Sequence, residues 1–194
     1  KRLRIQPLND DLTANGDPIV VEGDPNQGAT IKAEISGISK DATVVSGSNV
    51  GYYISRKGVG SPEVAFTLLD LPLDSETTIL GREKSTNGVQ YTGESTEAPY
   101  CSIVMESEDG QGNVALLGFF YGVFSKDKEE LDTEEEGKTF EPSGDSYTFT
   151  ASASKQTATK GKYMAKYAGA SAPAITELYT NVLLSDPSTS TGTG

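Results

Sequence analysis

The sequence contains no histidine, no tryptophan and only one cysteine among its 194 residues. The absence of histidine removes the commonest general base, the usual proton shuttle and the favoured zinc ligand, which argues against most hydrolases and metalloenzymes. A single cysteine forms no disulfide within the chain, so nothing here demands an oxidising compartment. We therefore expect a protein that is not an enzyme and that binds no cofactor and no metal ion.

Positive charge and long apolar runs are also scarce. The chain has 16 Lys and Arg against 28 Asp and Glu, a formal net charge of -12. Such a balance argues against tight binding of nucleic acid, because that binding replaces phosphate counterions with Lys and Arg, whereas an acidic wall would repel phosphates. No apolar run approaches the roughly 18 residues that span a bilayer, and the opening KRLRIQPLND does not predict a signal peptide.

Three stretches invite a functional interpretation, and in each a structural one is favoured. Cys101 alternates with Ile103 and Met105, which predicts a buried thiol and not a nucleophile. ESEDGQGN resembles half of a calcium loop but lacks the terminal bidentate Glu, so an acidic hairpin turn is expected. The aromatic run NVALLGFFYGVFS is apolar on both faces, which favours a central strand or a buried interface over a ligand pocket.

The remaining pattern is dominated by β-strands. Residues 1–28 are rich in Asn, Asp, Gly and Pro and predict an N-terminal arm with one short extended piece at residues 19–21. Strand patterns punctuated by turn residues follow at 30–38, 50–57, 64–71, 89–94, 100–108, 113–125, 145–154 and 161–168. Residues 72–81 predict one short helix, capped by Asp74 or Ser75 and ended by Gly81.

The fold class expected is mainly β, an antiparallel β-sandwich or part-barrel with one short flanking helix, extended loops and terminal arms. The β domain is assigned to residues 29–183, and the polar residues 184–194 to a flexible C-terminal tail. Within the acidic stretch SKDKEELDTEEEGKTFEP, the possible helix DKEELDTEEEG offers only Leu131 as an apolar anchor, so the stretch is interpreted as a solvated connection and not as a helix.

The order of these segments resembles a known family. PYCSIVMESEDGQGNVALLGFFYGVFS pairs an acidic-ended strand with an apolar aromatic one, and FEPSGDSYTFTASA places Glu-Pro before an alternating Thr-rich strand. With the segments around them, over residues 29–183, these runs are similar to the major tail protein, or tail-tube protein, of siphophages that infect Gram-positive bacteria. None of the matching runs is a catalytic signature.

The resemblance implies a structural subunit whose six-membered rings stack into a tube through which the viral DNA passes. Its partners would be further copies of itself, other tail proteins such as the tape measure and the tail terminator, and double-stranded DNA that passes without tight binding. No membrane is involved. The protein would be made in the cytoplasm of the bacterial host and would end in the tail of the virion.

Candidate channel-lining residues follow from strand alternation. Glu34 alternates with Ile31, Ala33 and Ile35, and Glu106 alternates with the apolar residues of its own strand, so both carboxylates are expected to point away from the apolar side. These two residues and Glu108 are the candidate channel wall, and an ordinary solvated outer face explains them equally well. The candidate inter-subunit loop comprises Lys40, Asp41, Val44, Val45 and Asn49.

Two other classes of protein share these features. A cell-surface or pilus-type β domain would have the same strands and acidity, but would be expected to carry a secretion signal. A carbohydrate-binding β-sandwich would use exposed aromatic rings, for which Tyr52, Tyr53, Tyr91 and Tyr100 are candidates. A non-catalytic adhesion or carbohydrate-binding domain is therefore the alternative.

The acidic run 126–136 is expected at a ring face or on the tube exterior.

Overall fold

The computed structural model describes residues 2–24, 27–40, 44–47, 50–54, 58–129 and 143–184, with only the backbone described in 44–47 and 50–54. Its elements are β1 (Arg2–Pro7), β2 (Ile19–Val21), β3 (Ala29–Ser36), β4 (Val44–Gly47), β5 (Val50–Ile54), β6 (Glu63–Leu69), α1 (Leu73–Leu80), β7 (Glu83–Lys84), β8 (Gln90–Tyr91), β9 (Tyr100–Glu108), β10 (Val114–Ser125), β11 (Asp145–Ala151), β12 (Met164–Ala168) and α2 (Ala172–Leu183).

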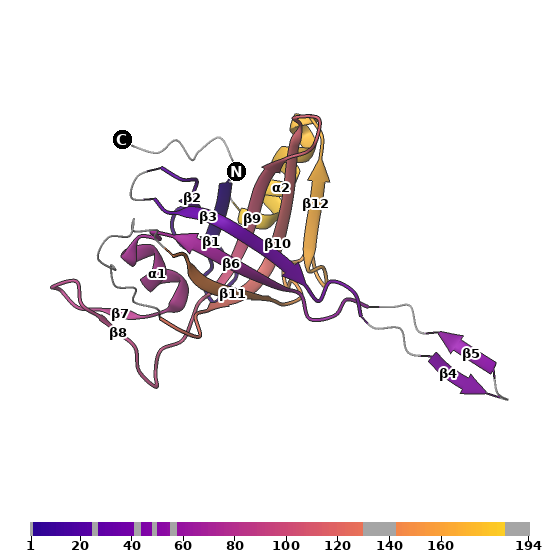
Figure 1. Cartoon of the computed structure of the whole chain (residues 1–194), viewed down its shortest axis with the longest axis horizontal. Coiled ribbons are helices and arrows are strands. Elements are labelled where there is room, and N and C mark those ends of the chain that lie inside the picture. The colour runs from indigo at the N-terminus through magenta and orange to yellow at the C-terminus, as the bar shows by residue number, and fades with distance from the viewer. Residues whose placement is uncertain are drawn as a thin grey trace, which may run out of the picture.

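Eight of these strands form one antiparallel sheet, which includes six of the predicted strands, whereas the predicted strands at 50–57 and 89–94 correspond to β5 and β8 in separate two-stranded sheets. Its order is β2-β1-β9-β10-β11-β6-β3, with β12 paired to β10 beside this path. The sheet is curved but not closed, which confirms the mainly β, part-barrel class. The hairpin of β4 and β5 is a separate two-stranded sheet that projects away from the body (Figure 1).

The twelve-residue strand β10 holds the sheet together because it changes partners along its length. Residues 115–119 pair with β12 and residues 122–125 pair with β11, while β9 follows most of the strand with a register shift between Phe119 and Gly122. A Cβ on Gly122 would lie 2.5 Å from the carbonyl oxygen of Thr150, so only glycine lets β11 approach at this bend. The predicted central strand is confirmed.

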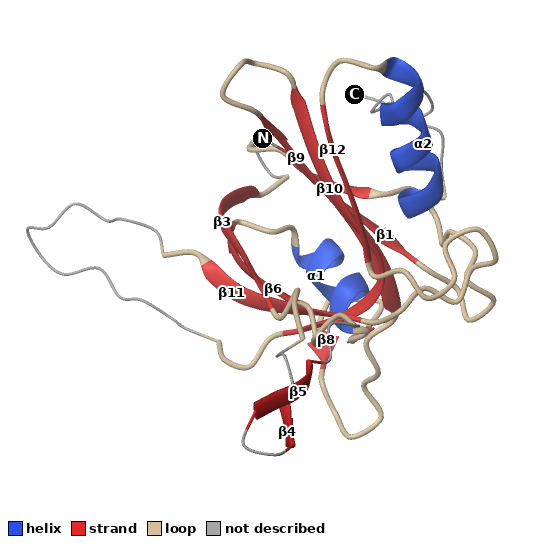
Figure 2. Cartoon of the chain, turned by 90° about the vertical axis from the view of Figure 1, so that its right-hand side faces the viewer, coloured by secondary structure: helices blue, strands red, loops and turns tan. Residues whose placement is uncertain are grey.

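Each face of the sheet carries its own apolar cluster and its own helix. The inner face carries fifteen buried residues: Leu3, Ile5, Val21, Val64, Phe66, Leu68, Ile79, Leu80, Cys101, Ile103, Phe119, Phe124, Tyr147, Phe149 and Ala151. The outer face carries nine: Leu8, Val104, Leu116, Phe120, Tyr121, Leu178, Tyr179, Val182 and Leu183. Helix α1 contributes to the inner cluster and α2 to the outer cluster, and the two helices lie on opposite sides of β10 (Figure 2).

The predicted helix exists, but its predicted N-cap is wrong. Helix α1 starts at Leu73, and Pro72 occupies the N-cap position, where the fixed φ of proline suits a helix start. Asp74 therefore lies in the first turn, where its negative charge is favourable to the helix dipole. Gly81 ends the helix as predicted, with φ 65° and its N–H directed to Thr77 and Thr78.

A second helix, α2, was not expected from the sequence. Pro173 lies in its first turn, and its buried residues Leu178, Tyr179, Val182 and Leu183 recur with helical spacing. The expectation of a single flanking helix is therefore corrected to two. This helix covers a sheet face that strand alternation alone would leave to solvent.

The expected N-terminal arm is also corrected. Residues Arg2–Pro7 form a strand in register with β9, although the short extended piece at Ile19–Val21 is confirmed as β2. Leu3 and Ile5 are buried in the inner cluster, while Arg2, Arg4 and Gln6 point to the outer face. These polar side chains obscured the strand pattern. In the structure Arg2 pairs with Glu22 and Glu106, Arg4 lies over the Tyr179 ring of α2, and the Gln6 amide donates to the carbonyl oxygens of Pro7 and Gly16.

Candidate functional site

The first candidate channel residue, Glu34, lies on the outer face of edge strand β3. Its side chain is 65% exposed, and its carboxylate accepts a 2.7 Å hydrogen bond from the Lys32 ammonium. This bond and the charge of Lys32 lower the pKa of Glu34, so the group stays ionised at neutral pH. Ile35 packs on the inner cluster as predicted, but Ile31 is 56% exposed because the β3–β6 register shifts between Thr30 and Lys32.

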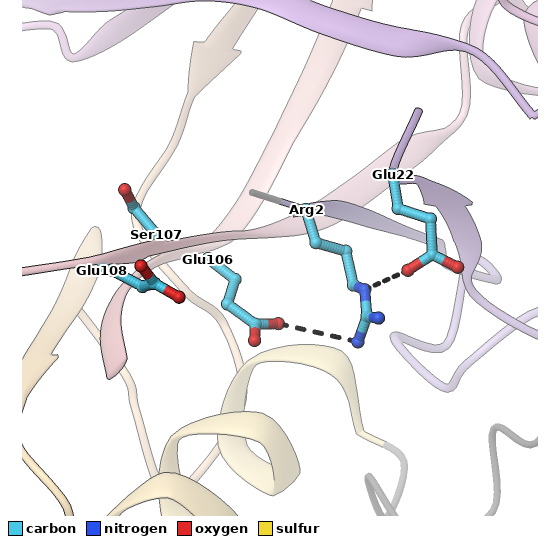
Figure 3. Close-up of a pocket in the computed structure, with 5 residues that line it drawn as sticks. All are labelled: Arg2, Glu22, Glu106, Ser107 and Glu108. Atoms are coloured by element: carbon cyan, nitrogen blue, oxygen red, sulfur yellow. Dashed lines mark ion pairs between the residues drawn. The ribbon is translucent and has the colours of Figure 1, made fainter. Parts of the chain in front are cut away.

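The other two candidates, Glu106 and Glu108, lie at the end of β9 beside Arg2. The Arg2 guanidinium contacts Glu22 through Nε and lies 3.9 Å from Glu106 through Nη1 (Figure 3). These four residues and Ser107 line a cavity of about 160 Å³. Strands β1 and β9 and the residue that follows β2 therefore bring one cation and three carboxylates to the same end of the sheet. Glu34 is not among the residues that line this cavity.

Glu106 is more constrained than an outer-face carboxylate was expected to be. The hydroxyl of Tyr179 on α2 donates a 2.9 Å hydrogen bond to Glu106 Oε2. Burial and the nearby charge of Glu106 raise the pKa of Tyr179 to about 12, so the hydroxyl remains a donor at neutral pH. The Glu106 carboxylate thus connects α2 to the sheet through this hydrogen bond. The contact could be predicted from the sequence only if α2 itself were predicted.

The candidate inter-subunit loop is described only in part. Lys40 is exposed, and Val44 and Val45 belong to β4, where they pair with Ile54 and Tyr53 of β5. Asp41 and Asn49 lie outside the described residues. The backbone of β4 and β5 therefore forms a hairpin that leaves the sheet between β3 and β6.

The start of the acidic run is anchored by a buried group of charges that we call the Lys126 network. The Lys126 side chain is 2% exposed, and its ammonium lies 2.7 Å from Glu129, 3.1 Å from Glu76 and 3.3 Å from Asp145. Arg82 lies 3.4 Å from the same Glu76 oxygen. Burial alone would lower the pKa of Lys126, but its hydrogen bonds to Glu129 and Glu76 outweigh that effect and raise it.

Sequence reasoning missed this network. Lys126 is 50 residues from Glu76 in the sequence, and a Lys at the start of an acidic run has no pattern that predicts burial. The remainder of the run, residues 130–142, lies outside the described residues. The structure thus fixes where the acidic connection begins, beside α1 on the inner-face side.

The tyrosines proposed for sugar stacking have different environments. Tyr100 stacks on Tyr121 with ring centroids 4.2 Å apart, and the Lys155 ammonium lies 5.3 Å from the Tyr121 ring centroid. One face of Tyr100 is therefore already covered. Tyr91 is 56% exposed, whereas the side chains of Tyr52 and Tyr53 are not described.

Cys101 and the turn sequence ESEDGQGN adopt the structural roles predicted for them. Cys101 is fully buried, and burial raises the pKa of its thiol to about 12. Asp109 accepts hydrogen bonds from the backbone of Gln111 and from the backbone and side chain of Asn113, so its oxygens close the β9–β10 turn. In the part of the chain that the structure describes, no three His, Cys, Asp or Glu side chains are grouped to hold a metal ion.

Neither of the two helices in the described part of the chain is long and apolar enough to cross a membrane.

Two long edges of the sheet have a partner on one side only. Among the described strands, β3 pairs with β6 alone and β12 pairs with β10 alone. The unpaired edge of β3 also carries the exposed Ile31. Open edges of this kind are available for strand addition by another chain.

The described residues form a curved antiparallel sheet with open edges, an architecture that suits assembly with other chains. Comparison with protein families agrees: the model of the phage tail tube protein family matches residues 5–184. The chain therefore belongs to the phage tail tube protein family and is a structural component of a virion tail. Searches of curated proteins and of solved structures found no match.

Proposed function

We propose that this protein forms rings, six subunits in each, that stack into a tube around an acidic channel for the viral DNA. The match to the phage tail tube family over residues 5–184 carries the proposal. The open edges of β3 and β12 support it, because a head-to-tail contact between two different edges closes into a ring when its rotation closes. In this role the protein performs no catalysis.

Weak contact with DNA is the physical requirement of the channel. Duplex DNA carries about one negative charge per 1.7 Å of its axis, so a basic wall would hold it and an acidic wall lets it slide. We propose Glu34, Glu106 and Glu108 as contributors to that wall. Glu34 and Glu108 are exposed, and the Glu106 side chain keeps 29% of its surface exposed.

The proposed partners and setting follow from the same role. The tube would contact the tape measure inside and the tail terminator at one end, and the loop from Lys40 to Asn49 would contact a neighbouring subunit. We propose a siphophage with a Gram-positive host, synthesis in the host cytoplasm, and genome ejection as the step that the tube serves.

Electron microscopy of the purified protein across a concentration series, with its mass measured in solution, tests ring formation. Tubes or six-fold rings with a central hole are expected. A monomer at all concentrations, together with binding on a glycan array, would instead favour the carbohydrate-binding alternative.

The channel wall is tested in complete virions that carry Glu34→Lys and Glu108→Lys. These residues are exposed, so normal tubes are expected, with slower genome ejection. Glu94→Lys, which makes the same charge change in an exposed loop, is the matched control. Normal tubes with unchanged ejection would count against the channel assignment.

A further inference from the structure

A groove runs between the edge strand β12 and helix α2, which lie side by side in Figure 1. Its volume is about 600 Å³, and Phe120, Lys162, Lys166, Tyr167, Glu177 and Leu178 are among its lining residues. Phe120 and Leu178 are almost fully buried and form an apolar floor, while both lysines are exposed. The groove therefore combines an apolar base with positive charge at its rim.

The lysines of this region lack carboxylate partners in a chain that has an excess of carboxylates. Elsewhere in the described residues, Lys32, Lys84 and Lys126 each form an ion pair, while Lys155 lies over the Tyr100 and Tyr121 rings and Lys40 is exposed. Lys160, Lys162 and Lys166 have none within the part of the chain that the structure describes. Lys162 and Lys166 line the groove itself, so in a protein of net charge -12 their ammonium groups give this one groove the charge that suits an acidic partner.

We propose that this β12–α2 groove binds the acidic segment 130–136 of a neighbouring copy of the chain. That segment, ELDTEEE, holds five carboxylates and no basic residue, which complements Lys162 and Lys166. Its one apolar residue, Leu131, suits the floor formed by Phe120 and Leu178. Glu177 at the rim opposes an acidic partner, so the lysines must outweigh it.

The proposed contact joins two subunits because the described start of the acidic run, up to Glu129, and the groove lie on opposite faces of one subunit. The Lys126 network fixes the start of the acidic run beside α1, whereas the groove opens beside α2. Helices α1 and α2 belong to the inner and outer clusters respectively. Each copy then presents its acidic segment to one neighbour and its groove to another, which is a head-to-tail contact. This inference rests on the proposed tube assembly.

The test uses two charge-reversed variants of the full chain. Variant one carries Lys162→Glu and Lys166→Glu in the groove, and variant two carries Glu130→Lys, Glu134→Lys, Glu135→Lys and Glu136→Lys in the segment, which changes the charge of residues 130–136 from -5 to +3. Each alone should need about tenfold more protein than wild type to form tubes at low salt, because like charges then face each other across the contact. Thermal unfolding of each variant checks that the subunit folds normally.

Mixing the two variants distinguishes contacts between subunits from contacts within one. In an equal mixture, the acidic groove of variant one meets the basic segment of variant two, and the reverse pair also matches, so alternating tubes should form near the wild-type concentration. A single Lys166→Glu change is compared with Lys84→Glu, an equal charge change at an exposed pair far from the groove. Only Lys166→Glu should hinder assembly.

The outcomes separate this inference from the tube proposal. Wild-type tubes with both variants assembling normally would overturn the groove contact and leave the tube intact. Failure of the mixture to recover would overturn the contact between neighbours. Wild-type protein that forms no tubes under any condition would count against the proposed function itself.

Discussion

Replacing Lys126 with methionine should be the most damaging single change in the charged part of this protein. Lys126 is 2% exposed, and the substitution leaves Glu76, itself 8% exposed, with Arg82 at 3.4 Å as its remaining cation. Removing one member of a buried ion pair costs about 3 to 5 kcal/mol, because the other charge stays buried without its partner. Since Arg82 retains part of the compensation, we expect the low end, about 3 kcal/mol.

Thermal and urea unfolding of the purified subunit measure this loss. For a chain of this size, about 3 kcal/mol lowers the Tm by roughly 6 to 12 °C. Lys84→Met is the matched control, since it removes the same charge from an exposed pair with Asp74 and should cost less than about 1 kcal/mol. Equal losses for Lys126→Met and Lys84→Met would refute the argument that burial decides the effect.

The network also has a pH signature. The pKa of Lys126 is raised in the folded state, so its contribution to stability is complete below the ordinary pKa of lysine, about 10.4, and is lost as pH rises through the raised value. Lys126→Met should therefore flatten the loss of stability in alkaline solution. A second variant with Glu76→Leu added should be less destabilised than the sum of the two single changes, because the unpaired carboxylate is gone.

Two further substitutions and one labelling experiment test other parts of the structure. Tyr179→Phe removes the hydrogen bond to Glu106 and should lower the free energy of unfolding by about 1 kcal/mol. Between pH 10 and about 12 the tyrosine ionises in the unfolded chain before it ionises in the folded one, so the stability of the wild type should decrease as the pH rises. The decrease should be smaller in Tyr179→Phe. Gly81→Ala should lower the free energy of unfolding by at least about 2 kcal/mol, because φ is 65° and a Cβ would lie 1.9 Å from the Glu97 carbonyl oxygen. Gly88→Ala, with φ 86° and open space around the Cβ, should cost only about 1 kcal/mol. Equal values from urea unfolding would contradict the steric argument. In the folded protein, Cys101 should react with a thiol reagent at pH 8 roughly a thousandfold more slowly than it does in the unfolded chain, because burial raises the pKa of its thiol to about 12. Rapid labelling of the folded protein would show that the inner core opens readily.

The sequence was most informative where the sheet is most apolar. The β9–β10 hairpin could be predicted because Ile103 and Met105 alternate along β9, β10 is apolar on both faces, and Asp109-Gly110 supplies the turn. Helix α1 was predictable from Pro72 and Gly81, although its first residue was not. In these segments local preference and tertiary packing favour the same structure.

Prediction failed where polar residues are buried by partners distant in sequence. The alternation of Leu3 and Ile5 in β1 was hidden by arginines and a glutamine. Their partners, such as Glu22 for Arg2, the Tyr179 ring for Arg4 and the Gly16 carbonyl oxygen for Gln6, are at least ten residues away in the sequence. Helix α2 had a readable signal, Pro173 followed by apolar residues at helical spacing, but a helix of twelve residues is stabilised mainly by its packing, here on the outer face of the sheet. The Lys126 network had no local signal, because it exists only once α1, β10 and β11 meet.

The positions of the acidic side chains also change what each can contribute to a channel. A cation within ion-pair distance cancels most of the field of a carboxylate beyond about 8 to 10 Å, the Debye length in physiological salt. Glu106 faces Arg2 and Tyr179, and Glu34 faces Lys32, so both act largely as local partners. Glu108 has no ion-pair partner among the described residues, so its charge extends furthest into solvent. If the three line the same channel, Glu108→Gln should therefore slow DNA passage more than Glu34→Gln, and Lys32→Gln, which frees Glu34, should speed it.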